Sequence, residues 1–181
     1  MILLVSGKEC PLDWTNKRLG AIMKKIFVTI LKVFGAAILI LVIGLFVLLL
    51  AAPFVNDNVA KKTMEELIEL PLPENTEYIE SLCRAGKLIG CGNGMQYFGA
   101  ILIKSELSRE ELEAYYASFA EHDWECVVEN QVGAEIRIDG EGVAFFSTNV
   151  EGDHYYIVYS WSSSDTIFDV LDMRRQGVNK Y

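Results

Sequence analysis

Histidine is nearly absent from the 181 residues: only His122 and His154 occur. Neither stands in an H-E-x-x-H or similar spacing, so the sequence does not favour a histidine metal site, and we expect neither metal nor cofactor. Basic residues are also scarce, and the formal net charge is −9. Because contacts to phosphate groups need a basic face, this charge excludes a typical nucleic-acid-binding protein.

Motifs for nucleotide or calcium binding are incomplete. Residues 90–94 are rich in glycine but lack the Lys-Ser/Thr pair of a P-loop and precede a predicted strand rather than a helix. Residues 149–153 carry oxygen ligands at alternate positions, as a calcium loop begins, but the glycine and glutamate that complete such a loop are missing. We interpret both segments as turns, with Asn93 as a candidate for ligand contact.

Charge is missing from one long stretch, residues 33–55, which lies between Lys32 and Asp57. Sixteen of its 23 residues are Leu, Ile, Val or Phe, which favours membrane insertion by on the order of 6 kcal/mol. As a helix it would be roughly 35 Å long, enough to cross a hydrocarbon core of about 30 Å. The stretch therefore predicts a transmembrane helix rather than a buried core helix. Pro53 is expected to kink or end it.

Basic residues are concentrated before this stretch, which places the N-terminus in the cytoplasm by the positive-inside rule. They are Lys8, Lys17, Arg18, Lys24, Lys25 and Lys32. Residues 56–181 are then extracytoplasmic and acidic, with ten Lys and Arg against 23 Asp and Glu. The stretch is longer than the apolar region of a cleaved signal peptide, about 7–15 residues, and no cysteine stands directly after it as in a lipoprotein. We therefore expect an uncleaved signal anchor.

Four parts follow along the predicted chain. Residues 1–25 form a cytoplasmic tail, 26–55 the transmembrane helix, 56–72 a helical stalk and 73–181 an extracytoplasmic domain. Met23, followed by two lysines, has the form of the start of an exported bacterial protein. One interpretation is that translation begins there, and the other is a short cytoplasmic tail that begins at the first methionine.

Hydrophobic periodicity in residues 73–181 predicts an α+β fold with a mostly antiparallel sheet and helices on one face. Strands are expected at 76–83, 95–104, 124–129, 134–138, 143–148 and 154–162. Ser108 and Glu111 form a capping box that starts a helix after the second strand. A last short helix is expected to bury Ile167, Val170 and Leu171.

The predicted core combines this helix with alternating strand positions. It consists of Tyr97, Ile101, Leu112, Tyr116, Phe119, Trp124, Phe145, Ile157 and Tyr159. The last strand places Tyr155, Ile157, Tyr159 and Trp161 on one face, as the wall of a core beneath a helix. Tyr156 then lies on the opposite, half-solvated face, which makes it a candidate for ligand or partner contact.

Three of the four cysteines, Cys83, Cys91 and Cys126, follow the apolar stretch. A disulfide between Cys83 and Cys91 would close a short loop and contribute about 2–3 kcal/mol by loop-closure entropy. The alternative is three buried thiols that behave as small apolar residues. Zinc ligation would need a second pair at short spacing, which the sequence lacks.

Two segments of the predicted domain carry a resemblance. They are LPLPENTEYIES, residues 70–81, and GNGMQYFGAILIKS, residues 92–105. Both are similar to segments of small, single-pass, membrane-anchored bacterial proteins of no known activity. The resemblance implies a bacterial protein anchored in the cell membrane and implies no chemistry.

Two functional classes stay open. The first is a non-enzymatic anchored domain that binds a protein or cell-envelope partner, senses a signal or takes part in envelope assembly. The second is an extracytoplasmic hydrolase that uses Asp139, Glu141 or Asp153. General acid–base catalysis needs two carboxyl groups that converge in a cleft. Since these three lie in predicted turns, where acidic residues serve solvation, we favour the binding class and assign no catalytic residue.

Overall fold

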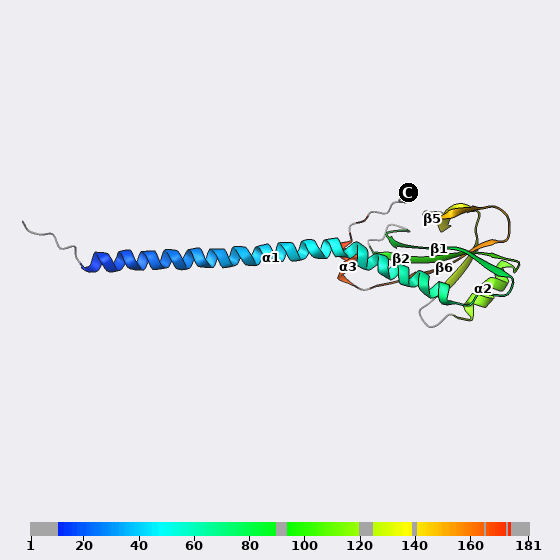
Figure 1. Cartoon of the computed structure of the whole chain (residues 1–181), viewed down its shortest axis with the longest axis horizontal. Helices are drawn as coiled ribbons and strands as arrows, with labels where there is room; N and C mark the ends of the chain where they lie inside the picture. Colours follow the sequence, from blue (N-terminus) through cyan, green and yellow to red (C-terminus); the bar gives the residue numbers. More distant parts are fainter. Residues whose placement is uncertain are drawn as a thin grey trace, which may run out of the picture. The chain divides into compact units, whose positions relative to one another are not determined.

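The computed structural model describes residues 11–89, 94–119, 125–138, 141–164, 166–172 and 174. It confirms an α+β chain with a long apolar N-terminal helix and a small antiparallel sheet domain. Two compact units divide the chain, Met1–Val47 and Leu48–Tyr181. All strands, the helices α2 and α3 and the last turns of α1 belong to the second unit (Figure 1).

Helix α1 runs from Pro11 to Glu69. The prediction that it could end at Pro53 is therefore wrong. A proline inside a helix removes one backbone hydrogen bond, but packing on either side can hold the helix together. Ala52, directly before the proline, and Asn56, three residues after it, are fully buried. Among the described residues, α1 is the one helix long and apolar enough to cross a membrane.

Four strands form the main sheet in the order β1-β2-β6-β3, with every neighbouring pair antiparallel. Their bounds are Thr76–Gly86 for β1, Gln96–Ser105 for β2, Tyr155–Ser162 for β6 and Cys126–Asn130 for β3. Helix α2, Arg109–Ala117, lies between β2 and β3 in the chain, and its predicted capping box of Ser108 and Glu111 is confirmed. The central strands β2 and β6 are buried along most of their length, because both faces of the sheet are covered.

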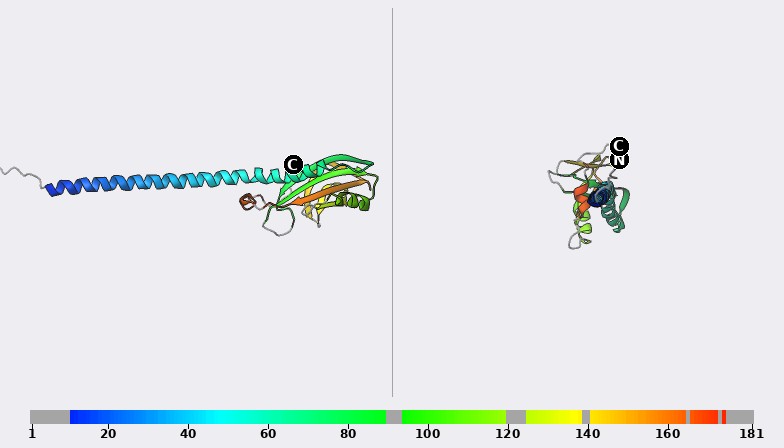
Figure 2. Two further views of the ribbon diagram at one scale, coloured as in Figure 1. Left: turned by 90° about the horizontal axis from the view of Figure 1, so that it is seen from below. Right: turned by 90° about the vertical axis from the view of Figure 1, so that its left-hand side faces the viewer.

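One face of the sheet carries helices, as predicted (Figures 1 and 2). Leu67 of α1 and the buried side of α2 pack there against Ile101 and Ile103 of β2. Gly99 of the same strand lets α1 approach closely, since a Cβ atom there would lie 2.5 Å from the backbone nitrogen of Met64. The segment predicted as a stalk, residues 56–72, therefore includes residues that contribute to the domain core.

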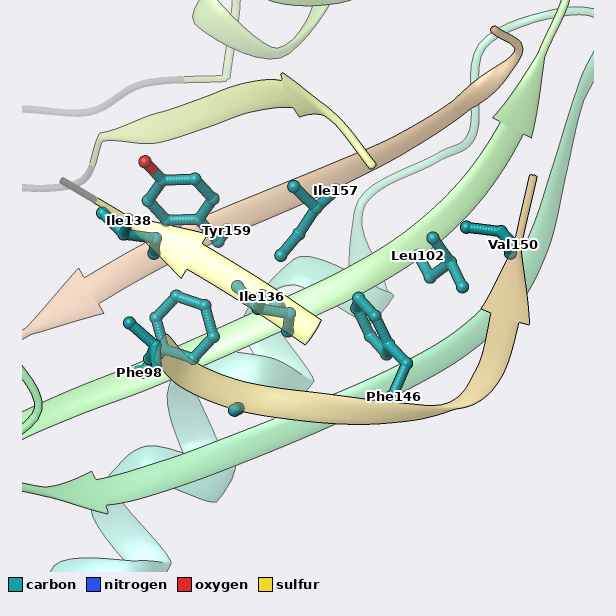
Figure 3. Close-up of a cluster of buried hydrophobic side chains, with 11 residues drawn as sticks. Phe98, Leu102, Ile136, Ile138, Phe146, Val150, Ile157 and Tyr159 are labelled. Atoms are coloured by element: carbon teal, nitrogen blue, oxygen red, sulfur yellow. The ribbon is translucent and has the colours of Figure 1, made fainter. Parts of the chain in front are cut away.

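A β-hairpin covers the other face. Strands β4, Gly133–Ile138, and β5, Glu141–Val150, pair as a separate two-stranded antiparallel sheet. Figure 3 shows Ile136 and Phe146 of the hairpin directed toward Phe98, Leu102 and Tyr159 of the main sheet. The aromatic face of β6 is thus the wall of a core beneath a hairpin, where the sequence predicted a helix.

Six of the nine predicted core residues are buried: Tyr97, Ile101, Leu112, Tyr116, Ile157 and Tyr159. Phe119 is half-buried, and Trp124 lies outside the described residues. Phe145 was predicted wrongly, because it is 37% exposed while Phe146 is 3% exposed. The pairing of β4 with β5 skips Val143, and such a bulge reverses the alternation of side chains beyond it.

The last helix, α3, spans Ile167–Leu171, close to its predicted place. The prediction that it buries Ile167, Val170 and Leu171 is wrong for the first two, which are exposed, whereas Leu171 is half-buried. The side of α3 that faces the domain carries Asp169, whose carboxylate accepts a hydrogen bond from the buried Tyr97. Periodicity placed the apolar side inward, but a polar contact with β2 sets the orientation of the helix.

Candidate functional site

Tyr156, the predicted contact residue, is buried, so its predicted half-solvated position is wrong. Its side chain packs among Leu67, Leu112 and Val158, because α1 and α2 cover this face of β6. Its hydroxyl donates to the carbonyl oxygen of Leu107 at 3.0 Å. Asn93, the other contact candidate, lies outside the described residues.

Two of the three acidic residues proposed for a hydrolase, Glu141 and Asp153, are described by the structure, and they lie apart. Glu141 begins β5, whereas Asp153 lies in the exposed turn that follows the other end of this strand. His154, next to Asp153, is exposed as well. Asp139 and the side chain of Glu141 lie outside the described residues. The described backbone therefore places Glu141 and Asp153 at opposite ends of β5.

The cysteines offer no activated thiol among the described residues. Burial raises the pKa of Cys126 to about 12, and burial followed by the nearby Asp57 raises the pKa of Cys83. A thiolate, the reactive form, is thus suppressed at both positions at neutral pH. Cys91, the predicted partner of Cys83, lies outside the described residues, so a disulfide between them stays a prediction.

A network of polar side chains that the sequence did not predict joins α3 to α1 and β2. We call it the α3 network; its members are Asn56, Asp57, Tyr97, Asp169, Asp172 and Arg174. Asn56 is fully buried at the end of the apolar stretch, and its amide nitrogen donates to Asp172 Oδ2 at 2.9 Å and to the carbonyl oxygen of Phe168 at 3.2 Å. Asn56 and Asp172 are 116 residues apart, so no local motif could have indicated their contact.

Tyr97 and Arg174 complete this network. The single hydroxyl proton of Tyr97 has two acceptors within reach, Asp169 Oδ1 at 2.5 Å and Asn56 Oδ1 at 3.0 Å, and the shorter bond to the carboxylate is the stronger one. Arg174 donates to Asp172 Oδ2 and to Asp57 Oδ1, both at 2.6 Å. Its guanidinium also reaches the carbonyl oxygen of Pro53 at 3.4 Å.

Two members of the α3 network, Tyr97 and Asp172, have fixed protonation states at neutral pH. Burial, and then the hydrogen bond to Asp169, raises the pKa of Tyr97 above its usual value of about 10, so the phenol stays neutral. Burial opposes the charge on Asp172, but hydrogen bonds from Arg174 and Asn56 outweigh it and lower the pKa of this carboxyl. Groups with such pKa values hold a structure together but are poorly suited to general acid–base catalysis near pH 7.

A second polar region lies at the opposite end of β1 and β2. It is a shallow hollow of about 320 Å³. It is lined by Asn75, Thr76, Glu77, Lys104, Ser105 and Glu106. Small-molecule sites are mostly apolar and enclose their ligand, whereas this hollow is open and polar. Among the described residues, no cluster of His, Cys, Asp or Glu could hold a metal ion.

Comparison with known proteins finds no matching family, no matching curated protein and no matching solved structure. A function is therefore proposed below from the residues and their arrangement alone. The described part of the chain offers an exposed apolar helix and a few exposed apolar side chains at the hairpin and on α3. The polar side chains of the α3 network bond to one another within the domain.

Proposed function

We propose that the chain is a single-pass membrane protein whose α+β domain lies outside the cytoplasm and acts as a non-enzymatic binding or envelope-assembly module. Residues 26–55 form the anchor, and the N-terminus lies in the cytoplasm. The observation that carries the proposal is the exposure of the apolar side chains along α1. The distribution of basic residues and the surface of the domain add support.

The anchor is supported by what surrounds α1. Phe34, Leu41 and Phe46 are each more than half exposed, and no described residue covers the helix between residues 33 and 47. Soluble monomeric proteins rarely expose a contiguous apolar patch larger than a few hundred Å². A lipid bilayer would cover this surface along its whole length. The excess of Lys and Arg before residue 33 supports a cytoplasmic N-terminus.

The binding class is supported by the surface of the hairpin. Phe145 projects from the outer side of β5, and Val132, in the turn before β4, is exposed. Aromatic side chains exposed in this way are typical anchors of protein–protein contacts. The outer face of the β4–β5 hairpin thus replaces Tyr156 as the candidate surface for a protein or cell-envelope partner. The hydrolase alternative loses support, because Glu141 and Asp153 lie at opposite ends of β5.

The anchor is tested by fractionating cells that express the full chain. We expect it to stay with the membrane after extraction with alkaline carbonate. In a chain whose four native cysteines are replaced by serine, a cysteine introduced at the exposed Asp153 should react with an impermeant maleimide in intact cells, and one introduced at Lys25 only after lysis. Release by carbonate would overturn the anchor, and the reverse labelling pattern would overturn the orientation.

The binding class is tested by a photocrosslinking amino acid at Phe145, with Lys62 on the exposed side of α1 as the control position. We expect a discrete crosslinked product from position 145 in native membranes and none from position 62. Asp153→Ala and His154→Ala should leave any cellular phenotype intact. If either substitution abolished the phenotype at an unchanged melting temperature, the hydrolase alternative would replace the binding class.

A further inference from the structure

The short helix α3 exposes two of its four apolar residues and directs a carboxylate toward the domain; its other two apolar residues, Phe168 and Leu171, are half-buried. Its end and its middle carry two carboxylates, Asp172 and Asp169, that hydrogen bonds hold inside the domain. Ile167 and Val170, three residues apart, are 63% and 83% exposed. A surface helix of a water-soluble domain buries its apolar side and exposes its charges. The exposed side of α3 is therefore suited to apolar surroundings.

This helix lies beside the last turns of the apolar stretch 33–55 (Figure 1). The amide nitrogen of Asn56 donates to the carbonyl oxygen of Phe168 at 3.2 Å, so α3 contacts α1 directly where the stretch ends. Phe54 is in the same part of α1 and is 78% exposed. On the proposed topology, this is the level at which α1 leaves the hydrocarbon and enters the head groups.

The charges around α3 are compatible with a lipid surface. Residues 56–181 are strongly acidic, and free carboxylates would be repelled by anionic head groups. Next to α3, however, Arg174 forms ion pairs with Asp172 and Asp57, both at 2.6 Å. The sequence continues with Arg175 and, five residues later, Lys180. The residues that follow α3 in the sequence thus include basic ones, and anionic head groups attract basic residues.

We propose that α3 lies in the interfacial layer of the membrane, where Ile167, Val170 and Phe54 contact lipid. The inference rests on the proposed transmembrane anchor and deepens it by naming a second lipid contact. With two contacts, the membrane restrains the orientation of the domain. The hollow around Ser105, at the opposite end of β2 from Tyr97, then faces away from the bilayer.

The test places an environment-sensitive fluorescent amino acid at single positions of the full chain. The protein is reconstituted in vesicles of phosphatidylcholine with a minor fraction of phosphatidylglycerol. Position 170 reports the proposed contact and position 43 reports the anchor. Val132 provides the matched control, because it is also an exposed valine, 72% exposed, but lies in the turn before β4. Lipids with a doxyl quencher near the head group or near the end of the acyl chain then report depth.

We expect position 43 to lose emission with the deep quencher, position 170 with the shallow quencher, and position 132 with neither. Quenching at 43 without quenching at 170 would overturn the contact of α3 and leave the anchor intact. No quenching at 43 would overturn the anchor and this inference together. Equal quenching at 170 and 132 would indicate unspecific adsorption of the domain and would also overturn the inference.

A second variant distinguishes lipid contact from mere proximity. Ile167→Glu should abolish the shallow quenching at position 170, because a charge is excluded from the apolar part of the interface. Its melting temperature in detergent should stay unchanged, since the side chain is exposed. Val132→Glu, the matched control, should leave the quenching at position 170 as it is. Persistent quenching in the Ile167→Glu protein would contradict the proposed contact.

Discussion

Gly99 illustrates how one residue sets the distance between α1 and the sheet. A Cβ atom at this position would lie 2.5 Å from the backbone nitrogen of Met64 and 2.7 Å from the carbonyl carbon of Thr63. Both contacts are with backbone, so a rotamer change cannot relieve them. Thr63, which donates to or accepts from Ser162 at 2.6 Å, depends on the same close approach.

Gly99→Ala should therefore lower the free energy of unfolding by about 1–3 kcal/mol, the usual cost of overpacking a core. Gly94→Ala is the control, because nothing lies within 4 Å of a Cβ atom there. It should change the free energy of unfolding by no more than about 0.5 kcal/mol. Urea unfolding of the full chain in detergent, followed by circular dichroism, measures both. Equal effects would mean that α1 does not pack closely on β2.

Phe145 and Phe146 provide a second comparison at the scale of single residues. Phe146→Ala should lower the free energy of unfolding by about 3–5 kcal/mol, because it removes a buried ring from the core beneath the hairpin. Phe145→Ala should cost about 1 kcal/mol or less, since the ring is partly in solvent. Thermal melts of the two variants measure the difference. A larger loss for Phe145→Ala would mean that the bulge at Val143 is absent.

Most of the buried residues could be predicted from the sequence, because burial follows local alternation of apolar residues in strands and helices. The exposure of Phe145 could not be predicted. It results from a bulge, which depends on how two strands pair, and the alternation of residues within one strand does not show that pairing. Tyr156 could not either, since the cover on its face comes from residues of α1 and α2 that are distant in sequence.

At the scale of elements, the α3 network is what attaches α3 to the rest of the domain. No residue of α3 is fully buried, and only Phe168 and Leu171 are half-buried, so apolar packing alone does not fix its position. The attachment also depends on hydrogen bonds from Tyr97 and Asn56 and on the ion pairs of Arg174. Replacing only one partner of such a buried pair lowers the free energy of unfolding strongly, because the other partner is left buried without a hydrogen bond.

Tyr97→Phe should lower the free energy of unfolding by about 1–3 kcal/mol at neutral pH, because it removes a hydrogen bond to a carboxylate. Tyr78→Phe, at an exposed tyrosine, should change it little. The pKa of Tyr97 is raised in the folded state, so its contribution is complete below about pH 10 and is lost as the pH rises further.

The stability of the Tyr97→Phe variant should therefore fall less steeply above about pH 10 than that of the native chain. Some alkaline loss remains in both, because burial also raises the pKa of Tyr116. Urea unfolding at a series of neutral and alkaline pH values gives the slope of the free energy of unfolding against pH for each protein. Identical slopes would show that folding does not raise the pKa of Tyr97, and would contradict its burial beside Asp169.

The order of strands and helices was readable because each element carries its own signal. The capping box of Ser108 and Glu111 starts α2, and turn residues separate the strands. The orientation of α3 had no such signal. Its apolar residues have helical spacing, and only the distant partners Tyr97 and Asn56 decide which side faces the domain. The position of the β4–β5 hairpin over the second face of the sheet could not be predicted either. It depends on contacts between distant segments, which local sequence patterns do not show.

At the scale of the whole molecule, α1 takes part in both compact units. Its apolar stretch could be read directly from composition, because a run of 23 uncharged and mostly apolar residues is long enough to span a bilayer. The role of its last turns was less apparent. Ala60, Thr63 and Leu67 recur at helical spacing and are buried, so this part of α1 supplies one wall of the domain core.

A fragment of residues 56–181 should therefore fold without the membrane anchor, whereas a fragment of residues 73–181 should not. Removing residues 56–72 uncovers Tyr97, Ile101 and Ile103. Exposing such side chains costs about 1.5–3 kcal/mol each, and with the loss of Leu67 the total approaches the whole stability of a small domain, about 5–15 kcal/mol. Circular dichroism should show a cooperative thermal transition for the longer fragment alone. A cooperative transition in both would mean that residues 56–72 are a separate stalk.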